Sequence, residues 1–186
     1  TNPENARKIF ETASISQLYF NTKKYAFAVM SLYRLIEEIG QAAAEEVLQV
    51  NISKRPGQQT LLKALQLLQL QSVYPQVEFD RYGLPALLIF GKHHPEINQE
   101  LKNLFELLIP MCSHANGRYN KGINILRNQC FLAHDDKPVK AEDLDKHVSG
   151  FLSQGKLTEL FSSLGLPVAN IYNQMNSELD KMFLQE

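Results

Sequence analysis

The stretch Ala28-Val29-Met30-Ser31-Leu32-Tyr33-Arg34-Leu35-Ile36-Glu37 lies within the longest segment of the chain that repeats its apolar residues at a helical period. Apolar side chains recur at three- and four-residue intervals across Lys23–Gln49, and Gly40 is the only weak helix former near the middle of that range. We therefore predict one long helix here, with a face buried in a core that the rest of the chain must cover.

The other segments show the same helical period. Further helices are predicted at Pro3–Leu18, Gln58–Ser72, Pro95–Leu108, Asn116–Asp135, Ala141–Leu152 and Pro167–Phe183, with a short one from Leu157. The pair Pro56-Gly57 predicts a loop. The apolar run Ala86–Phe90 is assigned to a helix because no second strand candidate exists to pair with it. With 186 residues, 44% of them hydrophobic, the chain suits a single all-α domain spanning 1–186.

Charge and cysteine content narrow the classes of function. The net charge of −1 gives no global indication of nucleic-acid binding, yet residues 115–140 hold five basic side chains against two acidic ones. The two cysteines lie in apolar surroundings, which predicts reduced, buried thiols and a cytoplasmic protein. No apolar run has the length of a membrane span. Because the chain begins at Thr1 without a signal peptide or an initiator Met, we expect it to be a domain of a longer protein.

The basic region contains the stretch Arg127-Asn128-Gln129-Cys130-Phe131-Leu132-Ala133-His134. In a continuous helix the seven steps from Arg127 to His134 total about 700°, so both side chains would face the same way. Asn124 extends this polar stripe, and Cys130 falls on the apolar face that would anchor the helix to the core. An Arg that binds phosphate oxygens and a His that exchanges a proton near neutral pH suit metal-independent RNA cleavage by the 2′-hydroxyl group.

The same stretch resembles the signature of HEPN ribonucleases, in which an Arg, often followed by a polar residue, precedes a His by a few positions. The stretch Ala28–Glu37 is similar to the Leu-Tyr-Arg-x-hydrophobic-Glu helix of one HEPN branch, the CARF–HEPN ancillary ribonucleases of type III CRISPR systems. The resemblance covers the chain from about Tyr25 to Phe151. It implies a dimeric, HEPN-like helical bundle that cleaves single-stranded RNA in antiviral defence. It also implies an upstream CARF sensor domain, absent here, that binds cyclic oligoadenylate.

The resemblance assigns roles to particular residues. His134 would move protons, Arg127 would stabilise the charge that develops on the phosphorane, and Asn128 would orient the substrate or neighbouring side chains. Arg118, Lys121 and Asn124 would bind the RNA. No cofactor is expected. No metal site is expected either, because adjacent His93-His94 and the pair Cys112-x-His114 lack the spacing of common zinc ligands; surface histidines are the favoured interpretation.

Several alternatives stay open at this point. Arg34 and Glu37 suit either an ordinary solvated ion pair beside a Tyr33 core contact or support for the catalytic face. Tyr119 and Phe131 suit either base stacking or the core. Arg127 paired privately with a carboxylate would leave a non-catalytic RNA- or nucleotide-binding HEPN module. A toxin–antitoxin type of HEPN partner protein would instead bury the motif face in an apolar interface.

Overall fold

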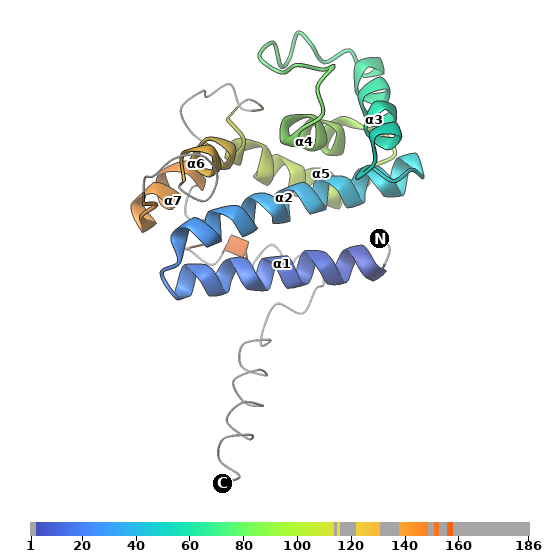
Figure 1. Ribbon diagram of the computed structural model, residues 1–186. Helices are drawn as coiled ribbons and strands as arrows, with labels where there is room; N and C mark the ends of the chain where they lie inside the picture. Colours follow the sequence, from blue (N-terminus) through green and yellow to red (C-terminus); the bar gives the residue numbers. More distant parts are fainter. Residues whose placement is uncertain are drawn as a thin grey trace.

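The computed structural model describes residues 3–113, 115, 122–130, 138–148, 151–152 and 156–157 (Figure 1). These residues form seven α-helices and one 3-10 helix (η1), and they contain no strand, so the all-α prediction is confirmed. The elements are α1 (Pro3–Asn21), α2 (Tyr25–Leu48), α3 (Arg55–Leu67), α4 (Leu84–His93), α5 (Gln99–Leu108), η1 (Ile109–Met111), α6 (Ile123–Gln129) and α7 (Ala141–Val148).

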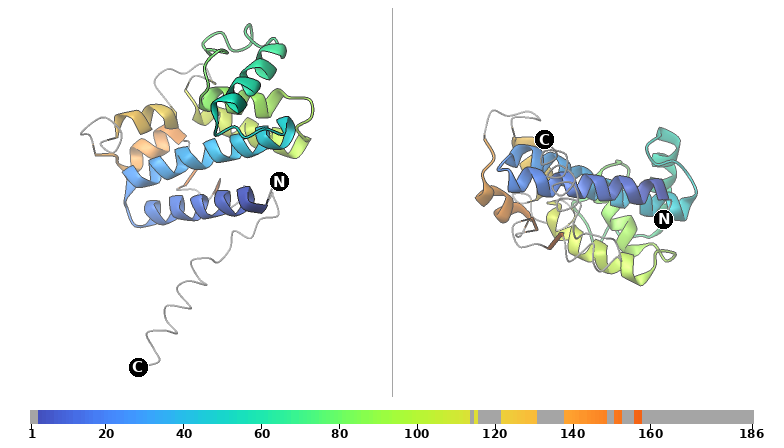
Figure 2. Two further views of the ribbon diagram at one scale, coloured as in Figure 1. Left: turned by 45° about the vertical axis from the view of Figure 1, so that its right-hand side comes forward. Right: turned by 90° about the horizontal axis from the view of Figure 1, so that it is seen from below.

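Helix α2 is the central element, as its length and apolar pattern predict. It contacts α1, α3, α4, α6 and α7, and α1 lies along one side of it in the opposite chain direction (Figures 1 and 2). Leu32, Leu35 and Ile36 are completely buried, while Ala28 and Ala44 give neighbouring helices room to approach closely. Helix α1 and helix α6 therefore both pack on α2.

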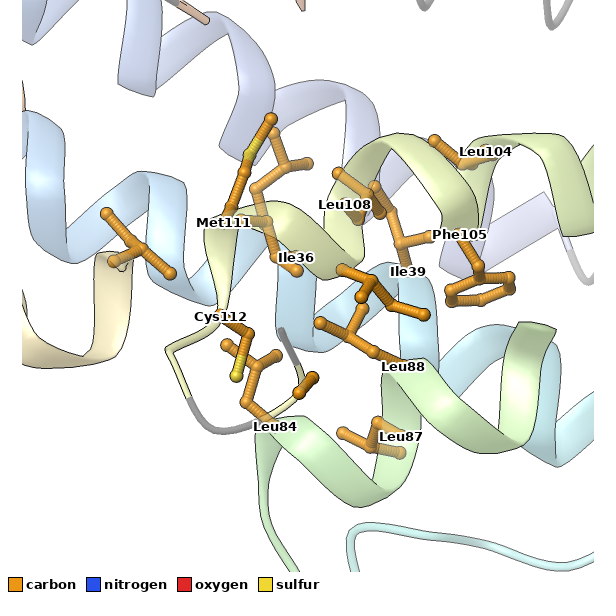
Figure 3. Close-up of a cluster of buried hydrophobic side chains, with 14 of the residues drawn as sticks. Ile36, Ile39, Leu84, Leu87, Leu88, Leu104, Phe105, Leu108, Met111 and Cys112 are labelled. Atoms are coloured by element: carbon orange, nitrogen blue, oxygen red, sulfur yellow. The ribbon is translucent and has the colours of Figure 1, made fainter. Parts of the chain in front are cut away.

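The main core lies between α2, α4 and α5. Ile36 and Ile39 of α2 meet Leu88 of α4 and Leu108 of α5 in the cluster shown in Figure 3. At Gly91 a Cβ atom would overlap the ring of Phe105, so this glycine allows α4 and α5 to pack closely. This packing explains why Ala86–Phe90 is helical: the whole run is buried against two other helices.

The boundaries of α3 and α5 differ from the prediction: α3 ends at Leu67 instead of Ser72, and both helices start at other residues than expected. Pro56-Gly57 does not form a loop but lies in the first turn of α3, where Pro is well tolerated and where Gly57 approaches the backbone of Asn51 too closely for any side chain. Helix α5 begins at Gln99 instead of Pro95, because the side chain of Asn98 accepts a hydrogen bond from the Leu101 N–H at 2.9 Å and caps the helix.

The C-terminal predictions are tested only in part. Helix α7 starts at Ala141 as predicted and is described to Val148. The helices predicted from Leu157 and at Pro167–Phe183 fall outside the described residues, apart from positions 156 and 157. Among the helices that are described, none combines the length and apolar character needed to cross a bilayer.

Candidate functional site

Helix α6 carries Arg127 and is held at its N-terminal end by a buried polar cluster. The side-chain oxygen of Asn124 accepts a hydrogen bond from the Ser113 N–H at 3.0 Å, and its Nδ2 donates to the Ser113 hydroxyl at 2.8 Å. The N–H of Gly122 donates to Nδ1 of His147 in α7 at 3.1 Å. These bonds fix α6 against η1 and α7, since each polar group is satisfied by a residue from another element.

The start of α6 differs from the expected helix near Asn116. Gly122 has φ +146°, a conformation that a helix does not contain, and a Cβ atom there would lie 2.5 Å from the Ser113 nitrogen. The first helical residue is therefore Ile123. Its completely buried side chain begins the apolar face that the sequence predicts.

The end of α6 also differs, and this changes the geometric argument for the motif. The helix ends at Gln129, and Cys130 is extended, with φ −78° and ψ 149°. The Cys130 thiol is completely buried and donates to the backbone oxygen of Arg127 at 3.1 Å. The prediction of one helix from Arg127 to His134 is therefore wrong, and helical period no longer argues that their side chains face the same way.

Arg127 lies over an aromatic ring from the central helix. Its Cζ atom is 5.1 Å from the centroid of the Tyr33 ring, and Nη1 donates to Oδ1 of Asn128 at 3.0 Å (Figure 1 shows α2 beside α6). The Nε atom is buried without a hydrogen-bond partner. Within the described ranges, no carboxylate forms an ion pair with Arg127. The private salt bridge considered for this residue is thus not found in that part of the chain.

Tyr33 connects Arg127 with the charges of α2. Burial raises the pKa of the Tyr33 hydroxyl, the nearby Glu37 carboxylate raises it further, and the Arg127 guanidinium opposes both. Glu37 and Arg127 therefore both act electrostatically on the same half-buried side chain. Tyr33 of the stretch Ala28–Glu37 and Arg127, the first residue of the other stretch, therefore lie together.

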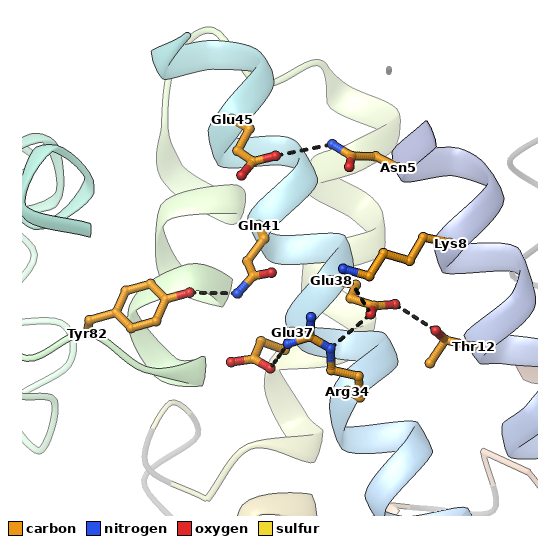
Figure 4. A network of polar contacts seen from close by, with 9 residues as sticks. All are labelled: Asn5, Lys8, Thr12, Arg34, Glu37, Glu38, Gln41, Glu45 and Tyr82. Carbon is orange, nitrogen blue, oxygen red and sulfur yellow. Dashed lines mark hydrogen bonds and ion pairs between the residues drawn. The ribbon is translucent and has the colours of Figure 1, made fainter. Parts of the chain in front are cut away.

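The Arg34–Glu37 ion pair, one of the two alternatives considered for these residues, is present, and it belongs to a larger network that links α1 with α2 (Figure 4). Arg34 Nη1 lies 2.7 Å from Glu37, and its Nε lies 2.9 Å from the carboxylate of Glu38. Glu38 also accepts from the Thr12 hydroxyl at 2.8 Å and lies 3.6 Å from Nζ of Lys8. Only 5% of the Glu38 side chain is exposed, so this residue is a buried anion with several partners.

A polar cavity of about 530 Å³ adjoins this network. It is lined by side chains of α1 and α2, by the segment before α3 and by Tyr82, whose hydroxyl accepts from Gln41 at 2.9 Å. Glu45 also lines it and accepts from Asn5 at 3.2 Å (Figure 4). No sequence motif indicates this cavity, since its residues come from four separate segments of the chain.

Half of the predicted site residues can be located. Asn128 is exposed and bonded to Arg127, whereas both polar atoms of the Asn124 side chain engage Ser113, so its role in substrate binding stays a prediction. Three predicted site residues and two candidate stacking residues lie outside the described residues: Arg118, Lys121, His134, Tyr119 and Phe131. The contact between Tyr33 and Arg127 could not be predicted from the sequence, because nothing in either stretch specifies which helices are neighbours.

The adjacent histidines, His93 and His94, are partly buried, whereas the sequence favoured surface positions for them. Nε2 of His93 lies 2.8 Å from the hydroxyl of Tyr74, and the ring of His94 stacks on Phe90 with centroids 4.6 Å apart. Burial, followed by neighbouring lysines, lowers the pKa of His93; burial also lowers the pKa of His94. Both imidazoles therefore favour the neutral form and serve packing.

The cysteines are free and buried, as predicted. In the part of the chain that the structure describes, no three His, Cys, Asp or Glu side chains gather closely enough to hold a metal ion.

Comparisons of the chain with protein-family models, with curated proteins and with solved structures found no match. The HEPN resemblance therefore stays an expectation that rests on the two stretches of sequence.

Proposed function

We propose that the chain is a HEPN-type, metal-independent endoribonuclease that cleaves single-stranded RNA. The observation that carries the proposal is the state of Arg127. Its guanidinium lies over Tyr33, its Nε is buried without a partner, and it has no carboxylate partner among the described residues. Arginine is charged at physiological pH, and in this setting its terminal nitrogens can donate to an anionic ligand.

An RNA phosphate suits the accessible side of this arrangement. Because Nε is buried, a phosphate would meet the guanidinium at its terminal nitrogens, where Nη1 already donates to the exposed Asn128. The planar fork of Arg127 matches two non-bridging oxygens, and its charge stabilises the dianionic phosphorane more than the monoanionic diester. The site is therefore better suited to a phosphodiester undergoing reaction than to a neutral ligand.

The proposed reaction assigns a step to each predicted residue. A base takes the proton of the 2′-hydroxyl, the 2′-oxygen bonds to the adjacent phosphorus, and the bond to the 5′-oxygen breaks as an acid returns a proton. His134 supplies proton transfer, Arg127 stabilises the phosphorane, and Asn128 orients Arg127 through its 3.0 Å bond. Arg118 and Lys121 contact phosphates outside the scissile position.

One Arg and one His are too few to act as base, acid and charge clamp at once. We therefore propose a homodimer in which two motif stretches meet across a two-fold axis. In the resembled family an upstream CARF domain binds cyclic oligoadenylate. A domain of that kind would regulate this chain by adjusting the relative position of the protomers in CRISPR type III defence.

Product analysis tests the proposed chemistry. The protein should cut a labelled single-stranded RNA in excess chelator, leaving a 2′,3′-cyclic phosphate and a 5′-hydroxyl. A strand with one 2′-deoxy sugar at the scissile position should stay intact there. The variant Arg127→Ala, purified identically, controls for contaminating ribonuclease. Cleavage that needs Mg²⁺ and yields a 5′-phosphate would contradict the proposal. Binding without cleavage would favour the non-catalytic module.

A further inference from the structure

We propose that Tyr33 is a positioning residue for Arg127: its ring holds the guanidinium in place for the RNA phosphate while leaving the donors of Arg127 free. This inference rests on the proposed function and goes beyond it, because it assigns a role to a side chain that has no part in the proton transfers. The basis is the distance of 5.1 Å between Cζ of Arg127 and the centroid of the Tyr33 ring.

An aromatic ring suits this task better than a carboxylate. The face of the ring attracts a cation through its quadrupole, and this attraction uses none of the N–H groups. A carboxylate would instead take two donors and neutralise the charge that the phosphorane needs. Tyr33 is half-buried in the middle of α2, so the backbone of the central helix fixes the position of its ring.

The carboxylate nearest to Tyr33 along the chain is already engaged. Glu37, one helical turn further on α2, pairs with Arg34 at 2.7 Å. The pKa of the Tyr33 hydroxyl is raised first by burial and then by Glu37, and it is lowered by Arg127. The ion pair of Glu37 is thus made with Arg34, and among the described residues none is found between Glu37 and Arg127.

A further restraint on Arg127 comes from its own helix. Nη1 donates a hydrogen bond to the exposed Asn128, and water can compete for this bond. Nε has no hydrogen-bond partner. Without the Tyr33 ring, the long side chain of Arg127 would sample several rotamers, and only some of them would direct the fork toward the phosphate. Misplacement by about 1 Å can cost 100-fold in rate, so removal of the ring should lower kcat about 10- to 50-fold.

The test compares Tyr33→Phe, which keeps the ring, with Tyr33→Leu, which removes it. Tyr19→Leu is the matched control, because Tyr19 is also a partly buried tyrosine, packed on Phe27 with centroids 5.2 Å apart. Tyr33→Phe should retain kcat within about threefold, Tyr33→Leu should lose kcat with a smaller change in KM, and Tyr19→Leu should retain kcat. Equal losses in Tyr33→Phe and Tyr33→Leu, or no loss in either, would overturn the proposal.

A second readout does not depend on activity. The Nε–H group of Arg127 gives its own NMR signal, which Arg127→Lys identifies by its disappearance. In the wild-type protein, the Tyr33 ring current should shift this signal and the neighbouring side-chain protons away from their random-coil positions. Tyr33→Phe should preserve the shifts and Tyr33→Leu should abolish them. Random-coil positions in the wild-type protein would overturn the inference, even if Tyr33→Leu failed to fold. If the wild-type protein has these shifts but cleaves no RNA, the proposed function fails while the positioning contact stands.

Discussion

Replacement of Glu38 by Gln tests the buried network that joins α1 to α2. Glu38 is 5% exposed and binds Arg34 at 2.9 Å, Thr12 at 2.8 Å and Lys8 at 3.6 Å. The amide that replaces the carboxylate can still bond to Thr12, whose hydroxyl donates or accepts, but the bond to Arg34 loses its charge assistance. That difference is worth about 1–1.5 kcal/mol, and the longer, more exposed contact with Lys8 adds about 0.5 kcal/mol or less.

The expected loss for Glu38→Gln is therefore about 1–2 kcal/mol. For a chain of this size, the melting temperature should fall by about 3–6 °C, measured by circular dichroism or calorimetry. The control is Glu11→Gln on α1, which removes an ion pair of 3.5 Å between side chains that are 75% and 59% exposed. This control should melt within about 2 °C of the wild type. If Glu38→Gln melts together with Glu11→Gln, the network does not stabilise the helix pair.

Three further predictions address the fold, its pH dependence and the dimer. Gly57→Ala should lower stability by about 2 kcal/mol or more because its Cβ overlaps the backbone of Asn51; a rise of about 1 kcal/mol, as helix propensity alone predicts, would contradict this close approach. Burial lowers the pKa of His93, so below about pH 6.5 the unfolded chain binds more protons than the folded one, and stability decreases as the pH is lowered. The melting temperature of His93→Gln should therefore depend less on pH between about 7.5 and 5 than that of the wild type, and equal slopes would refute this. Mixed protomers of Arg127→Ala and His134→Ala should recover part of the RNA cleavage, whereas a fully active species that sediments as a strict monomer would rule out a composite site.

Much of the fold can be predicted from the sequence, because the helical spacing of apolar residues is visible in the sequence itself. The period across Lys23–Gln49 identifies α2, and the absence of a partner strand assigns Ala86–Phe90 to α4. Helix ends are less predictable where tertiary burial decides them. Cys130 is extended and its thiol is buried, and no local residue preference indicates that α6 ends before it.

The candidate site is predictable only in its residue types. Arg127 and Asn128 stand out through their pattern, but the environment of Arg127 depends on which helix α6 packs against. Tyr33 looks like an ordinary core aromatic in the sequence, and only the packing of α6 on α2 brings it to the guanidinium. Likewise, no sequence pattern predicts the network around Glu38, which forms because the packing of α1 on α2 brings Thr12 and Lys8 to its carboxylate.

The cleavage rate of Arg127→Ala measures whether Arg127 stabilises the phosphodiester in its transition state. Loss of one charged donor should lower kcat about 100- to 1,000-fold, and the melting temperature should stay near that of the wild type because the side chain forms no ion pair with the described residues. Arg7→Ala, which removes an arginine that is 75% exposed on α1, should cleave like the wild type. A folded Arg127→Ala variant that cleaves single-stranded RNA at the wild-type rate would contradict the account.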